Sequence, residues 1–594
     1  MCGIVGYIGE REALPILVDS LKRLEYRGYD SCGLALLASK MWVFKDKGRI
    51  GELEMSLPPL SAKMGIGHTR WATHGEPSKA NAHPHLDCSG RVAVVHNGVI
   101  TNFQKLKEQL LSQGHIFTSE TDSEVIAHLI ESCYRDDLLE AVGRALKEIE
   151  GSYAIAVICD GHDGIIAARN ESPLVIGVGD REFLVASDVA AILGRTQRVI
   201  YLEDGDIGFL SREGVRIFNH GVPIERKEQR VSWTIEEAQK GGYEHFMLKE
   251  IHEQPKMLGE MVREYIHAVE PRVELGLAKD MDFTNILPLA CGTSYYAALA
   301  GEHILGKLAH ILVRVALSSE FNYSEAVLDR TLAIAITQSG ETADTVRALK
   351  KAKGKGCSTL AITNVMASSI TRVADATFYL MAGPEISVAA TKSFTAQLIA
   401  LYLLALSWAR IDLPSQRKLT DELRKLPGKV ARVLAEEEKI AEYSKYIATY
   451  DNVFYIGRGL NLPVALEGAL KLKEISYIHA EGYPSGELKH GPLALVTSTM
   501  PVLAIVANDN TYDITLANIK EIKARGAPVI ALASEQDTES EKYADSVIRV
   551  PEVDPVLSPI VNTVVLQLLA YYAARERGCP IDMPRNLAKS VTVE

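Results

Sequence analysis

Residues 397–402 read Gln-Leu-Ile-Ala-Leu-Tyr, and residues 567–572, 170 positions later, read Gln-Leu-Leu-Ala-Tyr-Tyr. The strand-like run that enters Gly292 has a counterpart that enters Gly457, at a spacing of 165. A near-constant offset between predicted elements indicates a duplicated domain. Each copy alternates strand, loop and helix, which is typical of a parallel sheet covered by helices. The repeat therefore predicts two doubly wound parallel-sheet domains.

The residues before position 230 follow a different pattern. Apolar side chains at helical spacing predict helices over residues 11–24 and 124–133. Strands that occur in runs, with helices packed outside them, are typical of an α+β sandwich. The predicted strands are short and rich in β-branched residues, and they cover residues 65–72, 91–96, 153–159, 165–169, 183–187 and 199–202.

The fold class predicted from these patterns is a multidomain α+β and α/β protein. Shifts in composition between the patterned segments suggest the boundaries. The predicted segments are a sandwich domain at 1–230, a linker at 231–280, a first repeat at 281–412, a charged helical linker at 413–445, a second repeat at 446–578 and a tail at 579–594.

Composition excludes several classes of function. The 594 residues are 47% hydrophobic and 24% charged, as in soluble globular proteins. The formal net charge of −12 disfavours nucleic acid as a partner, because nucleic acid requires a basic face. The eight cysteines include no CxxC pair, which suits free thiols in a reducing cytoplasm. The uncharged run 393–409 is short for a membrane span, so we expect a buried core helix and no membrane partner.

Cys2 is the first candidate catalytic residue. Trimming of Met1 would leave its α-amine free, and this amine, with a pKa of about 8, can act as a base beside the thiol. A small buried thiol at the start of a strand is an equally good interpretation of the position alone.

Four further residues would give the thiol a function. Attack of a thiolate on an amide carbon creates an oxyanion, which Asn97 and the backbone N–H of Gly98 could stabilise. Arg70 could bind a carboxylate and Asp122 an ammonium group, so the set fits glutamine. Alternatively, Asn97-Gly98 forms a hairpin turn, and Asp122 supports the N-terminus of a helix.

A second set of residues suggests a phosphorylated ligand. Two predicted strands run into hydroxyl-rich loops, 291–294 and 337–342, each followed by a helix. Backbone N–H groups and hydroxyls at a helix N-terminus bind phosphate, although the same hydroxyls could be simple N-caps. The loop 507–510 of the second repeat contains Asp509 and is unsuited to phosphate. We therefore expect the first copy to bind phosphate and the second to supply the chemistry.

The chemistry candidates lie in the second repeat and the tail. Lys471 and Glu474 share one helix face, either as a catalytic pair or as a surface ion pair. His490 lies in a loop with glycine on both sides. Lys589 lies in the tail, where a lysine is normally solvated, yet a desolvated lysine can form a Schiff base with a ketone.

Three motifs carry a family resemblance: residues 1–6 (MCGIVG), 24–31 (LEYRGYDS) and 68–75 (HTRWATHG). They resemble the glutaminase half of the isomerizing glutamine–fructose-6-phosphate aminotransferases, the glucosamine-6-phosphate synthases. The resemblance runs end to end. It implies an N-terminal-nucleophile αββα glutaminase sandwich (glutamine amidotransferase type 2) followed by two sugar isomerase (SIS) domains, no cofactor, and a homodimer.

The resemblance also implies roles for residues of the first domain. Cys2 would be the nucleophile, with Asn97 and Gly98 as the oxyanion hole. Arg27 and Trp71 would lie near a closing loop and the ammonia passage. The residues expected to hold glutamine are Arg70, Thr73, His74, Gly98 and Asp122.

In the sugar half, the same resemblance implies a Schiff base between Lys589 and fructose 6-phosphate. His490 would open the sugar ring, Glu474 would move a proton between C1 and C2, and Lys471 would assist. The residues expected to contact phosphate or sugar are Ser294, Thr337, Gln338, Ser339, Thr342, Val388 and Ala588.

Other functions fit the sequence less well. Asparagine synthetases and amidophosphoribosyltransferases need nucleotide or diphosphate loops that we do not find, and an SIS-type regulator would need a DNA-binding module. A metal site among His68, His74, His83, His85 and His96 is disfavoured, because their spacing matches no metal motif and no thiol pair joins them.

Overall fold

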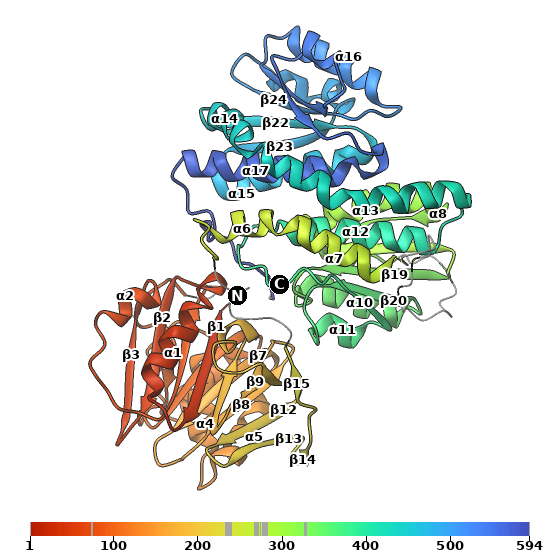
Figure 1. Cartoon of the computed structure of the whole chain (residues 1–594). Coiled ribbons are helices and arrows are strands. Elements are labelled where there is room, and N and C mark those ends of the chain that lie inside the picture. The colour runs from red at the N-terminus through yellow and green to blue at the C-terminus, as the bar shows by residue number, and fades with distance from the viewer. Residues whose placement is uncertain are drawn as a thin grey trace. The chain divides into compact units, whose positions relative to one another are not determined.

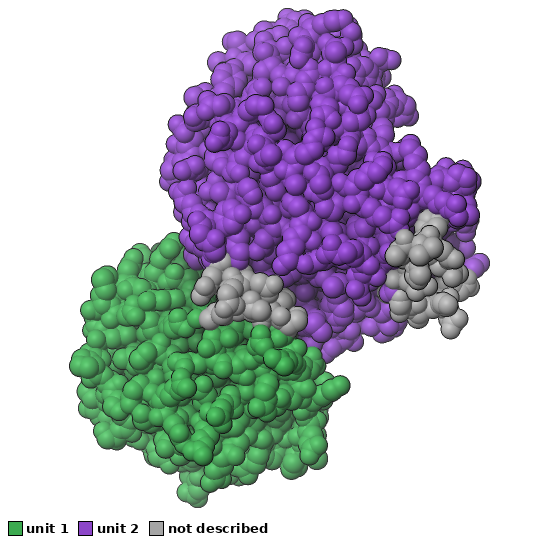
Figure 2. Space-filling view, in the orientation of Figure 1, with its two compact units in different colours: residues 1–239, 588–594 green, residues 240–587 purple. Residues whose placement is uncertain are grey.

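The computed structural model describes residues 2–72, 75–231, 240–266, 273, 275, 283–325 and 329–592. The chain forms two compact units (Figures 1 and 2). Unit 1 comprises residues 1–239 and 588–594, and unit 2 comprises residues 240–587. Residues 588–594 therefore belong to the same unit as residues 1–239.

Unit 1 contains two antiparallel sheets. In spatial order, the first consists of β15 (Gln229–Arg230), β11 (Arg198–Tyr201), β9 (Val175–Val178), β10 (Glu182–Ala186), β1 (Gly3–Gly9), β4 (Met64–Arg70), β2 (Ser31–Leu37) and β3 (Met41–Lys47). The second consists of β14 (Val222–Ile224), β13 (Gly214–Asn219), β12 (Asp206–Ser211), β8 (Ile165–Asn170), β7 (Gly151–Cys159), β6 (Val92–Ile100) and β5 (His85–Leu86). The helices are α1 (Ala13–Lys22), α2 (Ile50–Glu54), α3 (Phe103–Ser112), α4 (Glu124–Cys133) and α5 (Leu138–Glu148).

Alternation along β6 explains the layered packing of unit 1. Successive side chains of a strand point to opposite faces. Val92 and Val94 pack against α3, α4 and α5, whereas Ala93 and Val95 pack between the two sheets. With α1 and α2 against the first sheet, the unit is the expected αββα sandwich, and both faces of β6 are buried.

Unit 2 contains two parallel sheets. The first is ordered β17 (Leu312–Val313), β16 (Asn285–Ala290), β19 (Thr331–Thr337), β20 (Ser358–Thr363) and β21 (Ala376–Tyr379), and β18 (Ala316–Leu317) also pairs with β16. The second is ordered β23 (His479–Pro484), β22 (Asn452–Gly457), β24 (Val502–Val506), β25 (Val529–Ser534) and β26 (Ser546–Val550).

The helices of unit 2 repeat with the strands. Helices α8 (Gly292–Ala309), α10 (Ala343–Gly354) and α12 (Lys392–Ser407) correspond in order to α15 (Leu462–Ser476), α16 (Tyr512–Lys523) and α17 (Ser558–Glu576). The predicted duplication is therefore present in the fold. The remaining helices are α6 (Phe246–His252), α7 (Gln254–Tyr265), α9 (Ser318–Phe321), α11 (Ser369–Val373), α13 (Leu413–Ala435) and α14 (Glu437–Ala448).

The repeated sequence, residues 397–402 and 567–572, lies on α12 and α17, which are buried on almost every side. Together with α8 and α15 they lie between the two sheets and share one apolar core (Figure 1). Among the described residues, Pro555–Glu576 is long and apolar enough to cross a membrane by length and composition, but 94% of its most apolar window is buried. A helix that is apolar all round is expected in such a core.

Buried glutamines join the two copies in this core. The Gln254 amide nitrogen donates to Gln567 Oε1 and to the Ile251 carbonyl, 2.9 Å each, and Gln254 Oε1 accepts from Thr395 Oγ1 at 2.9 Å. Gln567 in turn donates to the Thr391 carbonyl at 3.0 Å. Buried polar groups need such partners, so this network fixes α7, α12 and α17 relative to one another.

We predict that Gln567→Leu destabilises unit 2 by about 1–3 kcal/mol, because it leaves the Gln254 amide and the Thr391 carbonyl short of partners in a dry core. Calorimetry of the full chain would measure the shift of the unit 2 transition. The exposed Gln536→Leu is the matched control and should change stability by less than ~0.5 kcal/mol. Equal effects of the two substitutions would show that the network does not contribute.

Candidate functional site

The backbone of Trp71 holds the thiol of Cys2. Cys2 precedes β1, whose register pairs Gly3 with Thr69 of β4, so the chain after β4 passes beside Cys2. The Trp71 N–H donates to Cys2 Sγ at 3.3 Å, and the thiol lies 3.5 Å from the Trp71 carbonyl oxygen. A central strand thus presents the thiol at its end, where it is partly exposed.

Asn97 lies beside Cys2 and is oriented by His68. The Asn97 amide nitrogen donates to the Cys2 carbonyl oxygen at 2.9 Å. His68 Nε2 lies 3.0 Å from both Asn97 Oδ1 and the His96 carbonyl oxygen. Both oxygens are acceptors, so His68 carries its proton on Nε2. Burial lowers the pKa of His68 to about 3, which keeps the ring neutral and the amide of Asn97 fixed.

The hairpin interpretation of Asn97-Gly98 is wrong. Strand β6 runs on to Ile100, and Asn97 and Gly98 pair with Ala154 and Tyr153 of β7. Gly98 has φ of 134°, and a Cβ there would lie 2.0 Å from the Ser152 carbonyl oxygen. Only glycine fits, because neither the space nor the backbone angle admits a side chain.

Arg70 and Asp122 are buried in the same region. Burial lowers the pKa of Arg70, and the charges of Cys2, Asp30 and Asp122 oppose this shift. Asp122 accepts from the Ile100 N–H at 2.8 Å, so β6 orients its carboxylate. An arginine and an aspartate near a thiol can bind the carboxylate and ammonium groups of an α-amino acid. Thr73 and His74 lie outside the described residues.

Arg27 is held by an ion pair. Its Nη1 lies 2.5 Å from Asp188 Oδ2, and its side chain is buried. Asp188 also accepts from the Ala190 N–H at 3.0 Å. In this structure, Arg27 therefore links the turn after α1 to the segment after β10.

The buried histidines support one another without metal-ligand geometry. The rings of His68 and His83 stack with centroids 4.1 Å apart, and His85 meets His83 edge-on at 4.6 Å. Burial lowers the pKa of all three, so they are neutral packing groups. His85 Nε2 lies 3.0 Å from Thr121 Oγ1. A capping box at the start of α4 would use the same Thr121 hydroxyl, which here contacts His85.

In unit 2, Lys471 lies between two carboxylates of its own helix, α15. Its Nζ is 2.6 Å from Glu474 Oε2 and 3.5 Å from Glu467 Oε1. It also donates to Thr293 Oγ1 at 3.0 Å. Thr293 belongs to the first turn of α8, so a residue of the first copy contacts the charged group of the second. The surface-pair interpretation is wrong, because Lys471 is only 1% exposed.

The surroundings of Glu467, Lys471 and Glu474 act differently on the pKa or the exposure of each side chain. Burial raises the pKa of the Glu467 carboxyl, and the adjacent Lys471 ammonium opposes this shift. Burial alone would lower the pKa of Lys471, but the Glu467 and Glu474 charges raise it. Lys471 is therefore held as an ammonium that can donate hydrogen bonds but cannot attack a carbonyl. Glu474, whose side chain is 20% exposed, is the member that a ligand can reach.

The hydroxyl-rich loop of the first repeat turns tightly into α10. Thr337 Oγ1 lies 2.9 Å from Thr342 Oγ1 and accepts from the Gly340 N–H at 3.3 Å, and Ser339 Oγ accepts from the Glu341 N–H at 3.1 Å. Gly340 has φ of 67°, and a Cβ there would lie 2.0 Å from Ser368 Oγ. The loop thus gathers hydroxyls and N–H groups at a helix N-terminus, which favours an anion.

Three other residues predicted to contact the sugar or phosphate, Ser294, Gln338 and Val388, each take part in a hydrogen bond. Ser294 Oγ accepts from the Gln397 amide at 2.9 Å. The Gln338 carbonyl accepts from the Asn364 N–H at 3.1 Å, and the Val388 N–H donates to the Asp582 carbonyl at 3.0 Å. Gln397 belongs to the repeated sequence, so its amide orients a predicted ligand group while its counterpart Gln567 joins helices.

The corresponding loop of the second repeat carries its own anion. Asp509 Oδ1 accepts from the Thr511 N–H at 2.7 Å and from Thr511 Oγ1 at 2.6 Å. These contacts lie at the start of α16, the counterpart of α10. A carboxylate already at this position disfavours a phosphate there, as the sequence predicted.

His490 and Lys589 belong to different units of the chain. His490 ends a short 3-10 helix, Glu487–His490, and is exposed. Ala588 and Lys589 belong to unit 1, whereas Lys471 and Glu474 belong to unit 2. The roles of Lys589 and His490 at the sugar site stay predictions.

The sequence interpretation missed three residues that contact the predicted site residues: His68, Glu467 and Thr293. His68 precedes Arg70 by two positions on the same strand, so alternation could have placed both on one face. Glu467 precedes Lys471 by four positions, the spacing of neighbours on a helix. Thr293 follows Gly292 in a loop already selected, but nothing local to it indicates the contact with Lys471.

The chain was compared with known proteins. The SIS domain profile matches residues 282–407 and 446–577, and a glutamine amidotransferase domain profile matches residues 68–194. Glutamine–fructose-6-phosphate aminotransferases [isomerizing] of Methanosarcina acetivorans and Thermus thermophilus are 49% and 48% identical, over the full length of both chains in each case.

A solved structure is also similar. The C-terminal domain of glucosamine-fructose-6-phosphate aminotransferase from Francisella tularensis is 40% identical, with a TM-score of 0.56, and the match covers 58% of this chain and 100% of that one. Taken with the full-length relatives, these matches show that the chain belongs to the family of isomerizing glutamine–fructose-6-phosphate aminotransferases.

Proposed function

We propose that the protein converts glutamine and fructose 6-phosphate into glutamate and glucosamine 6-phosphate, the first step of amino-sugar (UDP-N-acetylglucosamine) biosynthesis. One observation carries the proposal. A single chain holds a thiol beside an amide donor and, in its other unit, a buried lysine–carboxylate pair beside a hydroxyl-rich helix start. A glutaminase needs the first arrangement and a sugar isomerase needs the second. The assay of glucosamine 6-phosphate formation by the purified protein tests it directly.

Unit 1 would release ammonia from glutamine. Arg70 and Asp122 would hold the α-carboxylate and α-ammonium groups, together with Thr73 and His74. The Cys2 sulfur would bond to the amide carbon while Asn97 and Gly98 stabilise the oxyanion. The free α-amine of Cys2, once Met1 is removed, would pass the thiol proton to the amide nitrogen, which leaves as ammonia, and water then cleaves the thioester to give glutamate. His68 acts as a positioning residue, because it touches Asn97 and not the reacting atoms.

Unit 2 would carry out the sugar chemistry. Thr337, Ser339 and Thr342, with Ser294 and Gln338, would bind the phosphorylated sugar, and Val388 and Ala588 would lie nearby. His490 would open the ring. Glu474 would then move a proton between C1 and C2, with the Lys471 ammonium beside it to stabilise charge on the sugar oxygens.

The charge of Lys471 supports Lys589 as the amine nucleophile. A Schiff base requires a neutral amine, and the two carboxylates beside Lys471 hold it in the charged form. Of the two candidate lysines, Lys589 is therefore the better one. Ammonia released in unit 1 would pass internally to the sugar, with Arg27 and Trp71 near the passage. A cytoplasmic homodimer is part of the same proposal.

We predict that Cys2→Ala reduces ammonia release from glutamine to the uncatalysed rate, because no other thiol is held beside Asn97. The variant should still bind fructose 6-phosphate and interconvert it slowly with glucose 6-phosphate, since Glu474 can move the proton without nitrogen. Cys133→Ala is the control and should retain both activities. Glutaminase activity that survives in Cys2→Ala, with a glutamine-analogue electrophile labelling Cys32 or Cys88, would identify a different nucleophile.

We predict the reverse pattern for Lys589→Ala: glucosamine 6-phosphate formation is lost while glutamine hydrolysis survives. The loss follows from removing the amine that activates the ketone. Coupled assays of both products would measure it, and Lys473→Ala, an exposed position on α15, should behave like the unmodified protein. Undiminished synthesis by Lys589→Ala would exclude the Schiff-base role.

We predict that Thr342→Ala weakens fructose 6-phosphate binding by about 10-fold or more, as expected for a lost hydrogen bond to a charged group. Asp509→Ala, at the corresponding loop of the second repeat, should leave the affinity unchanged. Calorimetric titration without glutamine measures both. Equal losses would mean that the two loops have not diverged in function.

A further inference from the structure

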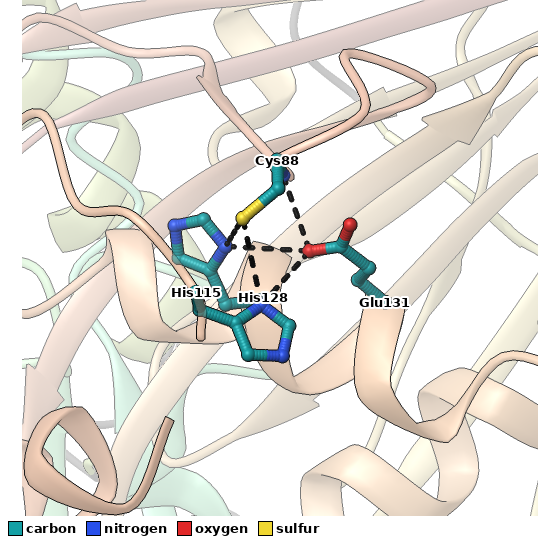
Figure 3. A group of neighbouring side chains, drawn as sticks. All are labelled: Cys88, His115, His128 and Glu131. Carbon is teal, nitrogen blue, oxygen red and sulfur yellow. Dashed lines mark hydrogen bonds and ion pairs between the residues drawn. The ribbon is translucent and has the colours of Figure 1, made fainter. Parts of the chain in front are cut away.

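Four side chains of unit 1, from three separate segments, converge on one point away from the groups described above (Figure 3). Cys88 lies in the turn between β5 and β6, and His115 lies in the loop after α3. His128 and Glu131 are three positions apart on α4, so they share a helix face. The sequence interpretation considered metal binding only among other histidines and missed this group.

The distances within the group are short and mutually consistent. Cys88 Sγ lies 3.6 Å from His115 Nδ1 and 3.5 Å from His128 Nδ1. Glu131 Oε2 lies 3.0 Å from His115 Nδ1 and 3.5 Å from His128 Nδ1. All four potential ligand atoms lie within 4.8 Å of one another.

The four sulfur–nitrogen and oxygen–nitrogen separations, 3.0–3.6 Å, are close to those of a tetrahedral zinc site. Bonds of ~2.3 Å to sulfur and ~2.0 Å to nitrogen, at the tetrahedral angle, place the two ligand atoms ~3.6 Å apart. Nitrogen and carboxylate ligands are similarly placed ~3.4 Å apart. Two imidazole nitrogens are directed at the same sulfur and at the same carboxylate oxygen, which also accepts from the Cys88 N–H at 3.1 Å.

The surroundings support metal ligation by these atoms. The Ile116 N–H donates to Cys88 Sγ at 3.4 Å, a contact that stabilises a thiolate. His128 is 1% exposed, and its other ring nitrogen lies 3.8 Å from Glu124 Oε1. At this separation the carboxylate makes no hydrogen bond to the ring, and His128 Nε2 has no hydrogen-bond partner among the described residues. Cys88 is exposed, which gives an ion access from solvent.

We propose that Cys88, His115, His128 and Glu131 bind one zinc ion per chain as a structural site. Sulfur, imidazole and carboxylate donors in this number suit Zn²⁺ better than Mg²⁺ or Ca²⁺, which prefer oxygen ligands. Binding displaces the thiol proton of Cys88 to solvent. Four protein ligands leave no open position, so the ion takes no part in catalysis. It fastens the β5–β6 turn and the loop after α3 to α4, the helix that begins directly after Asp122.

The test uses the full-length protein freed of metal by a chelator and titrated with Zn²⁺ against a chromophoric competitor. One tight site per chain is expected, and Cys88→Ser and His115→Ala should each weaken it at least ~100-fold. Cys133→Ser, on the same helix, and Cys2→Ala are controls that should keep the site. Circular dichroism checks that each variant is folded.

Two further measurements distinguish this site from adventitious binding. Co²⁺ should give the visible bands of a tetrahedral ion together with a thiolate charge-transfer band that Cys88→Ser lacks. Zn²⁺ should raise the unfolding temperature of unit 1 in the unmodified protein and not in Cys88→Ser. Equal Zn²⁺ affinity of the unmodified protein and Cys88→Ser, or loss of the tight site only in Cys2→Ala, would overturn the proposal. Neither outcome bears on the synthase activity.

Discussion

The burial of one ammonium group, that of Lys471, determines which side chains the two copies of unit 2 must bring together. A buried charge is tolerated only where opposite charges and hydrogen bonds replace its hydration. Glu467 and Glu474 supply the charge, and Thr293 supplies a hydrogen bond from the other copy of the repeat. Neither copy alone contains this arrangement. The packing of α8 against α15 in the shared core therefore creates the acid–base group as well as stability.

The two copies of the repeat also differ at corresponding positions. In the first copy, the loop before α10 keeps its hydroxyls and N–H groups gathered around Thr337 and Thr342. In the second, Asp509 occupies the corresponding helix start, and the buried Lys471 with its two carboxylates lies on α15. The repeated glutamines show the same division, since Gln397 bonds to Ser294 while Gln567 joins α7 and α12. Under the proposed function, the duplicated fold would separate sugar-phosphate binding from proton transfer.

In unit 1, strand pairing fixes the positions of the candidate site residues. Strand β1 is central in its sheet, paired with β4 and β10, and this pairing presents Cys2 to the backbone of Trp71. Strand β6, buried on both faces, carries Asn97 and Gly98 through the sandwich and orients Asp122 by the Ile100 N–H. Helix α4 starts beside Asp122 and carries two ligands of the proposed zinc site, so the ion would secure the element next to the glutamine-binding group.

The sequence by itself determined the elements and most candidate residues. Periodicity predicted α4 with its observed bounds, and the repeat predicted two parallel sheets. The motifs contain Cys2 and Arg70, and the chemistry of an amide ligand selected Asn97 and Asp122. Tertiary structure alone decided that Asn97-Gly98 continues a strand, that Lys471 is buried, and that His68, Glu467 and Thr293 complete the groups. It also brought Cys88 to His115, His128 and Glu131. Local patterns report neighbours along the chain, whereas these contacts join segments that only sheet pairing and core packing bring together, so no local propensity encodes them.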